Sequence, residues 1–211
     1  MAQILVFGDS ITYGVWDKYG GWVQKLRKFL DEKTLSKPET HFLIYNLGIS
    51  GDTVEDLLER FELETKQRLK ENEETIFIFA LGINDSQYIH SQKNLRYPPQ
   101  KFQRNLQTLI NLAQKFSSKI VFVGLTPVDE SKVDPMPWNI DRSYKNKYVQ
   151  KFNDIIKSIC NGNAIFYIEI YKNLVKTDYK RLLEDGAHPN SDGHQKIFEI
   201  VKEFLVEYRI I

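Results

Sequence analysis

The sequence predicts an α/β fold, a three-layer α/β/α sandwich built around a five-stranded parallel sheet. Strand-like runs alternate with helical patterns from one end of the chain to the other. The strand-like runs are almost continuously apolar, which is typical of strands covered on both faces of a parallel sheet. Strand, helix and strand in repeated order imply right-handed crossovers, which place helices on both faces of the sheet.

The five predicted strands are short runs rich in Ile, Val, Phe and Leu. They occupy 3–8, 41–48, 75–82, 119–125 and 164–170.

Helical patterns separate these strands. Four segments with mixed polar and apolar spacing are predicted as helices, at 21–32, 54–69, 100–116 and 143–159. The last predicted helix has the clearest apolar stripe, formed by Ile197, Ile200, Val201, Phe204, Leu205 and Tyr208. This spacing places the six side chains on one face of a helix.

Two predicted loops are longer than usual, 84–99 and 126–141, and the second holds three prolines. Both follow the carboxyl ends of predicted strands, the edge at which open α/β sheets bind their ligands. Because long loops in compact domains are often functional, we expect these two to shape a binding site.

Length and composition indicate one folded domain spanning 1–211, since single cores grow to about 250 residues before they split. Lys and Arg number 29 against 28 Asp and Glu, so the formal net charge is +1. Such a balance favours neither nucleic acid nor an anionic membrane surface. We therefore expect a small-molecule partner and no nucleic acid, while the oligomeric state stays open.

The sequence also predicts a cytoplasmic location. The single cysteine, Cys160, excludes an internal disulfide. The opening MAQILVFGDS has neither the basic segment nor the small-residue cleavage site of a secretory signal. No apolar run approaches the roughly 20 residues that cross a bilayer, so we expect no membrane span.

Four short polar motifs fall at the predicted ligand-binding edge. They read GDS at 8–10, SGDT at 50–53, GIND at 82–85 and DGAHP at 185–189. Each alone has an ordinary structural explanation as a turn, a helix cap or a loop. Their combination is more informative, because together they supply every part that acyl transfer by a serine requires.

The parts are a nucleophile, a base, a group that orients the base, and donors for an oxyanion. Ser10 is the candidate nucleophile, His188 the candidate base, and Asp185, three residues earlier, can orient the imidazole. The backbone N–H groups of Ser10 and Gly51 and the side-chain amide of Asn84 are candidate oxyanion donors.

These motifs resemble those of the SGNH (GDSL) hydrolases, a family of serine esterases, lipases and acylhydrolases. GDSIT, NLGISGDT, LGIND and DGAHPN occur in the family's order across essentially the whole chain. The resemblance implies a flavodoxin-like fold and a catalytic triad of Ser10, Asp185 and His188. It implies an oxyanion hole of Ser10, Gly51 and Asn84, no metal or other cofactor, and cleavage of carboxylic esters through an acyl-enzyme.

Aromatic side chains are dense around the predicted site: Tyr13, Trp16, Tyr19, Trp22, Tyr88, Tyr97, Trp138 and Tyr144. Tyr13 follows the nucleophile closely and Trp138 lies in the proline-rich loop, so we predict that these two contact the substrate. The others have the alternative role of packing loops against the sheet.

Other polar residues are assigned structural roles. His41, His90 and His194 lack metal-ligand spacing and are interpreted as surface or capping residues. Asp9, Asp52 and Asp85 are interpreted as bracing groups, because a glycosidase carboxylate pair would leave Ser10 and His188 unexplained.

Two alternatives remain beside an acyl esterase. A thioesterase or a carbohydrate O-acetylesterase would use the same site, and the sequence does not identify the acyl chain or the leaving group. A non-catalytic, flavodoxin-like ligand-binding module is the alternative of another class. A dinucleotide binder of this kind would need G-x-G-x-x-G after the first strand, where the chain has GDSITYG.

Overall fold

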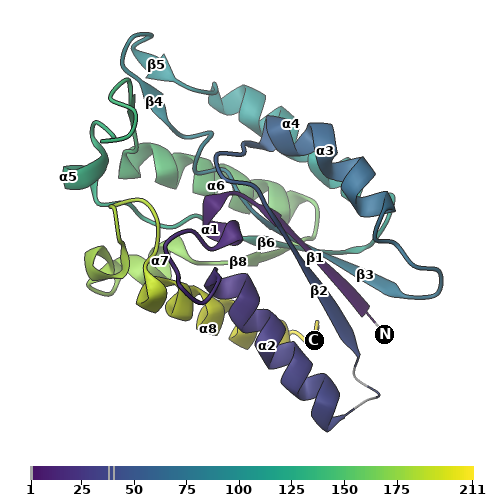
Figure 1. Cartoon of the computed structure of the whole chain (residues 1–211). Coiled ribbons are helices and arrows are strands. Elements are labelled where there is room, and N and C mark those ends of the chain that lie inside the picture. Colours follow the sequence, from purple (N-terminus) through teal and green to yellow (C-terminus); the bar gives the residue numbers. More distant parts are fainter. Residues whose placement is uncertain (1, 38, 40) are drawn as a thin grey trace.

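The computed structural model describes residues 2–37, 39 and 41–211, and its centre is a five-stranded parallel sheet (Figure 1). The strands are β1 Ala2–Gly8, β2 Phe42–Gly48, β3 Glu74–Ala80, β6 Lys119–Val123 and β8 Phe166–Ile168. Their order is β2-β1-β3-β6-β8, and every pairing is parallel. This is the flavodoxin-like strand order, so the predicted fold class is confirmed.

Long helices cover both faces of the sheet (Figure 1). One face carries α2 (Gly21–Ser36) and α8 (Ser191–Glu207), and the other carries α3 (Val54–Lys66), α4 (Pro99–Ala113) and α6 (Asn146–Gly162). The short helices are α1 Ser10–Tyr13, α5 Glu130–Val133, α7 Tyr171–Val175 and the 3-10 turn Tyr179–Leu182.

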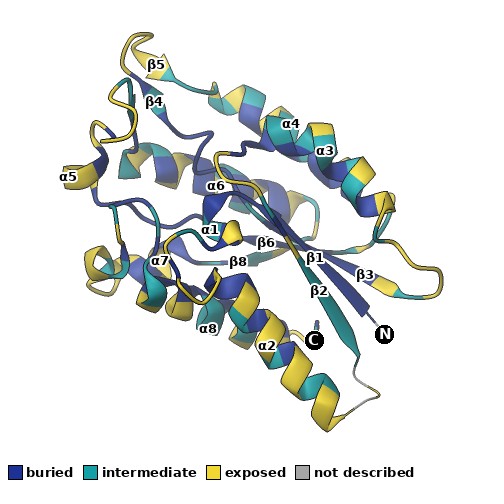
Figure 2. Cartoon of the chain, in the orientation of Figure 1, coloured by how far each residue is buried: buried dark blue, intermediate teal, exposed yellow. Residues whose placement is uncertain are grey.

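The strands divide the hydrophobic core into two layers. In β1, Leu5 and Phe7 pack with α3, α4 and α6, whereas Ile4 and Val6 pack with α2 and α8. All seven residues of β1 are buried (Figure 2). Burial on both faces is why the central strands carry apolar side chains on both faces rather than only at every second position.

The two predicted long loops contain structure that the sequence did not indicate. They hold β4 (Tyr88–Ile89), β5 (Asn94–Leu95) and α5, and β7 (Arg142–Ser143) follows directly. The three strands form a small antiparallel sheet in the order β5-β4-β7. The helix predicted from 143 therefore begins at Asn146, because the preceding residues pair with β4.

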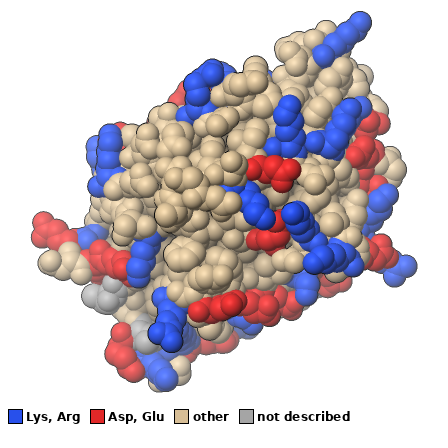
Figure 3. All heavy atoms as spheres, turned by 180° about the vertical axis from the view of Figure 1, so that it is seen from behind, with Lys and Arg blue, Asp and Glu red and all other residues tan. Residues whose placement is uncertain are grey.

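Charged side chains of both signs are dispersed over the surface, as the face in Figure 3 shows. Such mixing agrees with the net charge of +1. Among the residues that the structure describes, no helix combines the length and the apolar character needed to cross a membrane.

Candidate active site

The predicted nucleophile lies where the central strand β1 passes into α1. Asp9 caps that helix by accepting a hydrogen bond from the Ile11 N–H at 3.0 Å. A side chain at Gly8 would collide with Thr12 and with the Ala80 carbonyl of β3, so only glycine fits at this close approach. The Ser10 residue is almost fully buried.

His188 lies within hydrogen-bond distance of both Ser10 and Asp185, as the sequence predicts. His188 Nε2 lies 3.0 Å from Ser10 Oγ, and His188 Nδ1 lies 2.7 Å from Asp185 Oδ2. The other carboxylate oxygen, Oδ1, accepts the backbone N–H groups of Ala187 and His188, both at 2.9 Å. The loop is therefore folded around this carboxylate, which fixes the ring orientation of His188.

The electrostatics of Asp185 favour the charged form. Partial burial acts to raise its pKa, but the hydrogen bond from the His188 ring and those from the backbone of His188 and Ala187 act against it. The hydrogen bonds prevail and hold the pKa of Asp185 well below its usual range. The carboxylate can therefore stabilise a positive charge on the imidazole over a wide pH range.

The three predicted oxyanion donors converge on the same edge. Gly51 has φ +89°, a left-handed conformation that favours glycine. Within 2–37, 39 and 41–211, the backbone N–H groups of Ser10 and Gly51 donate to no protein acceptor. Two backbone donors are thus left for a ligand.

The side chain of Asn84 is held in one orientation. Its Nδ2 donates to the Asp52 carbonyl at 3.0 Å, and its Oδ1 accepts from Tyr144 Oη at 2.6 Å and from Gln87 Nε2 at 3.2 Å. Sequence reasoning missed the roles of Gln87 and Tyr144. Gln87 comes three residues after Asn84, and this spacing is the only signal that could have indicated it.

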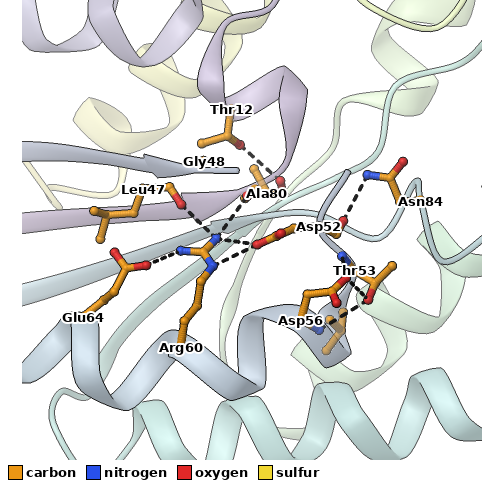
Figure 4. A network of polar contacts seen from close by, with 12 residues as sticks. Thr12, Leu47, Gly48, Asp52, Thr53, Asp56, Arg60, Glu64, Ala80 and Asn84 are labelled. Carbon is orange, nitrogen blue, oxygen red and sulfur yellow. Dashed lines mark hydrogen bonds and ion pairs between the residues drawn. The ribbon is translucent and has the colours of Figure 1, made fainter. Parts of the chain in front are cut away.

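Arg60 ties the Gly51 loop to the end of the sheet (Figure 4). Its Nε and Nη2 contact Asp52 Oδ2 at 2.8 and 2.7 Å, Nη2 donates to the Leu47 carbonyl at 3.0 Å, and Nη1 pairs with Glu64 at 2.8 Å. Burial raises the pKa of Asp52 although Arg60 opposes this rise. Sequence reasoning missed Arg60, whose contacts depend on the packing of α3 beside β2.

Asp9 and Asp85 brace the loops around the site, as expected. Asp85 caps α3, since its carboxylate accepts the Val54 N–H at 3.2 and 3.3 Å. Burial raises the pKa of Asp9 and of Asp85 to about 7, and the N–H groups of Ile11 and Val54 respectively oppose the rise. Two buried carboxyl groups near the site thus favour the neutral form below neutral pH.

The two aromatic residues predicted to contact the substrate are both exposed, Tyr13 at 61% and Trp138 at 51%. The ring centroid of Trp138 lies 5.9 Å from that of His188, whereas Trp22 and Tyr144 are buried. Trp16 has a contact that the sequence did not indicate: its indole N–H donates to Asp185 Oδ2 at 2.8 Å.

The interpretation of His194 as a surface or capping residue is correct as to capping and wrong as to the surface: its ring accepts a backbone N–H from the first turn of α2, but the residue is not exposed. His194 is fully buried between α2 and α8. Its Nδ1 accepts the Trp22 N–H at 3.3 Å, so its Nε2 carries the proton and donates to the Val15 carbonyl at 3.2 Å. Burial lowers the pKa of His194, which keeps the ring neutral. In the described part of the chain, no group of three His, Cys, Asp or Glu side chains could hold a metal ion.

Comparison with known proteins identifies the family. Residues 6–196 match the model of the GDSL-like lipase/acylhydrolase family. The chain belongs to this family. The family resemblance predicted from the four motifs is confirmed, and this GDSL-like hydrolase is an enzyme that cleaves ester bonds. The alternative of a non-catalytic module is thereby set aside.

Other proteins are similar to this chain in sequence or in fold. The GDSL-like hydrolase is 25% identical over 207 residues to an arylesterase of Vibrio mimicus, a match that covers 98% of this chain and 89% of the relative. The fold is similar to that of a lipase/acylhydrolase from Enterococcus faecalis, with TM-score 0.75, 20% identity and coverage of 97% and 95%. It is also similar to the acetyl xylan esterase AlAXEase, with TM-score 0.74, 20% identity and coverage of 96% and 99%.

Proposed function

We propose that the protein is a serine esterase that cleaves carboxylic esters through an acyl-enzyme, with Ser10, His188 and Asp185 as its catalytic triad. The observation that carries this proposal is the continuous series of hydrogen-bond distances from Ser10 Oγ through His188 to Asp185. A serine hydroxyl is a weak nucleophile until an adjacent base takes its proton, and an oriented imidazole is such a base.

The first half of the reaction forms the acyl-enzyme. Ser10 Oγ bonds to the ester carbonyl carbon while its proton passes to His188 Nε2, and the carbonyl oxygen becomes an oxyanion. The tetrahedral intermediate then collapses, the bond to the alcohol oxygen breaks, and His188 returns the proton to that oxygen. The alcohol leaves, and the acyl group remains on Ser10.

The second half repeats the chemistry with water. His188 accepts a proton from water as the water oxygen bonds to the acyl carbon, and the second tetrahedral intermediate expels Ser10 Oγ, which recovers the proton. Both intermediates carry an oxyanion. We assign its stabilisation to the N–H groups of Ser10 and Gly51 and to the second amide N–H of Asn84, since preorganised donors act on the charge as it develops. No step requires a metal or an organic cofactor.

A carbohydrate O-acetylesterase is the second candidate at the same site. Tyr13, Trp16 and Trp138 are all more than half exposed, and the rings of Trp16 and Trp138 lie beside His188. Exposed aromatic rings with a polar edge offer flat apolar faces to a partly polar ligand, as a sugar ring is. Tyr13 and Trp138 are therefore proposed as substrate contacts. A thioesterase would use the same triad.

The test is hydrolysis of p-nitrophenyl esters from acetate to longer acyl chains by the wild type and by Ser10→Ala. We expect Ser10→Ala to lower kcat by about 10⁴-fold or more, because the nucleophile is lost. Ser158→Ala, on the exposed face of α6, is the matched control and should keep wild-type activity. Wild-type activity in Ser10→Ala would overturn the assignment of the nucleophile.

The same assay separates the substrate classes. A preference for acetate together with release of acetate from acetylated xylo-oligosaccharides would favour the O-acetylesterase, and faster turnover of acyl thioesters would favour a thioesterase. Trp138→Ala should raise KM for the preferred ester. Unchanged substrate preference in a folded Trp138→Ala variant would count against its role.

A cytoplasmic location remains part of the proposal. The single cysteine, Cys160, is buried and free, which is compatible with a reducing compartment. Fractionation of cells that produce the protein, with immunodetection in the soluble and membrane fractions, tests it.

A further inference from the structure

The carboxylate of Asp185 has one hydrogen-bond partner beyond those that the proposed mechanism uses. Oδ1 accepts two backbone N–H groups of its own loop. Oδ2 accepts from His188 Nδ1 at 2.7 Å and also from the indole Nε1–H of Trp16 at 2.8 Å. The partner on Oδ2 thus comes from the other end of the chain, 169 residues away in sequence.

Packing does not explain where Trp16 lies. The residue is 61% exposed, whereas Trp22 of the neighbouring helix is 1% exposed. The Trp16 backbone has φ +67°, in the left-handed region that a bulky side chain rarely adopts. A strained, exposed tryptophan gains little from burial, so its conformation must be imposed by other contacts.

The residues on both sides of Trp16 supply those contacts. The carbonyl of Val15 accepts a hydrogen bond from the buried ring of His194 at 3.2 Å. The carboxylate of Asp17 accepts the N–H groups of Tyr19 and Gly21, both at 3.1 Å, and Oγ of Ser191 at 2.8 Å. The turn that carries Trp16 is therefore anchored to the start of α8, directly after the Asp185–His188 loop.

We propose that Trp16 is a positioning residue of this site: its indole N–H fixes Asp185 Oδ2 in the place from which that oxygen holds the His188 ring. The proposal rests on the proposed function, because it gives Trp16 a role only if Asp185 and His188 act together. Asp185 Oδ2 accepts hydrogen bonds from both the indole N–H and the imidazole N–H. The bond to the indole weakens the interaction of this oxygen with the imidazole, so Trp16 limits how strongly Asp185 stabilises the protonated ring. The Trp16 and His188 rings stand edge to face, with centroids 6.4 Å apart.

Trp16→Phe tests the proposal, because it removes the N–H and keeps an aromatic ring beside His188. We expect kcat/KM for a p-nitrophenyl ester to fall about tenfold, the typical effect of losing one hydrogen bond to a charged group. We also expect the acid limb of kcat/KM against pH to move to higher pH, because a carboxylate with one donor fewer holds the protonated base more strongly.

Trp138→Phe is the matched control. It removes an indole N–H from the other exposed tryptophan beside His188, and no hydrogen bond joins that indole to Asp185 in the described residues. This variant should change KM and leave the acid limb in place. If Trp16→Phe likewise changes KM and leaves the acid limb in place, Trp16 only lines the substrate site and the proposal is overturned.

The indole N–H proton of Trp16 provides a second test, which does not require the Trp16→Phe variant to fold. Its NMR resonance is recorded in the wild type and in Asp185→Asn. We expect an upfield move in the variant, because a hydrogen bond to a charged oxygen is replaced by a neutral contact. An unmoved resonance would overturn the proposal. Activity that survives in Ser10→Ala would instead refute the proposed function, so the two failures are distinguishable.

Discussion

At the scale of single residues, the two buried carboxyl groups beside the site determine how stability depends on pH. Burial raises the pKa of Asp9 and of Asp85 to about 7 in the folded protein, from an ordinary value of 3.8. Between these values the folded chain binds more protons than the unfolded chain. The free energy of unfolding therefore falls as pH rises from about 4 to about 7 and then levels off.

Asp185 has the opposite effect. Its pKa is lowered by folding, so the stability that it contributes is lost as pH falls below the ordinary value of 3.8. Taken together, these three groups place maximal stability near pH 4, where Asp185 is ionised and Asp9 and Asp85 are still neutral in the folded protein.

Asp85→Asn tests this dependence. The amide oxygen can still accept the Val54 N–H, but it does not ionise. We expect the variant to be more stable than the wild type at pH 8 by about 1 kcal/mol or more, and to be similar at pH 4, where Asp85 is largely neutral in both states. Urea denaturation at the two pH values measures the difference. An equal difference at both values would show that ionisation of Asp85 does not carry the effect.

The positions of site residues were predictable where the residues lie within a short motif. Ser10, Gly51, Asn84 and the Asp185–His188 pair were all indicated in this way, and the structure brings them to one edge of the sheet. Trp16 is an example of a site contact that could not be predicted from the sequence. Its indole bonds to a residue 169 positions away, and no local pattern specifies such a partner.

At the scale of elements, the N-terminus of α3 connects the helix layer to the site. Thr53 and Asp56 form a capping box: Thr53 Oγ1 accepts the Asp56 N–H, and Asp56 Oδ2 accepts the Thr53 N–H at 2.9 Å. Thr53 follows Asp52, whose carbonyl holds Asn84. The cap thus fixes the end of the loop that presents Gly51.

Thr53→Ala removes this cap, and we expect it to lower the free energy of unfolding by about 1 kcal/mol. Thr108→Ala is the control, since Thr108 is an exposed residue inside α4. Alanine favours helices, so this change should be neutral or slightly stabilising. Chemical denaturation of both variants measures the effects. Equal losses of stability would contradict the capping role.

The long helices and the strands of the five-stranded sheet were predictable from their sequence patterns. The residues at which they begin and end were less predictable. All five strands of the sheet and all five long helices lie where apolar runs and helical spacing indicated. The sheet β5-β4-β7 was not predicted, because strands of two residues are too short to show a period. Their pairing is fixed by tertiary contacts, such as the approach of His90 Nε2 to Ser143 Oγ at 2.6 Å.

At the scale of the whole molecule, the two core layers share the strands of one sheet, and this predicts cooperative unfolding. Trp22 lies in the α2 and α8 layer, and Phe61 lies in the α3 and α4 layer. In a Trp16→Phe, Trp138→Phe double variant, Trp22 is the only tryptophan. Its fluorescence and the far-UV circular dichroism should report one urea transition with one midpoint. Separate midpoints would contradict a single domain over 1–211.

The distance in sequence between Ser10 and His188, 178 residues, has a consequence for biosynthesis. The ribosome synthesises Ser10, the proposed nucleophile, 178 residues before His188, the proposed base. A nascent chain that has not yet exposed the Asp185–His188 loop contains the serine without its base. On the proposed mechanism, hydrolytic competence therefore arises only after every strand of the sheet has been made.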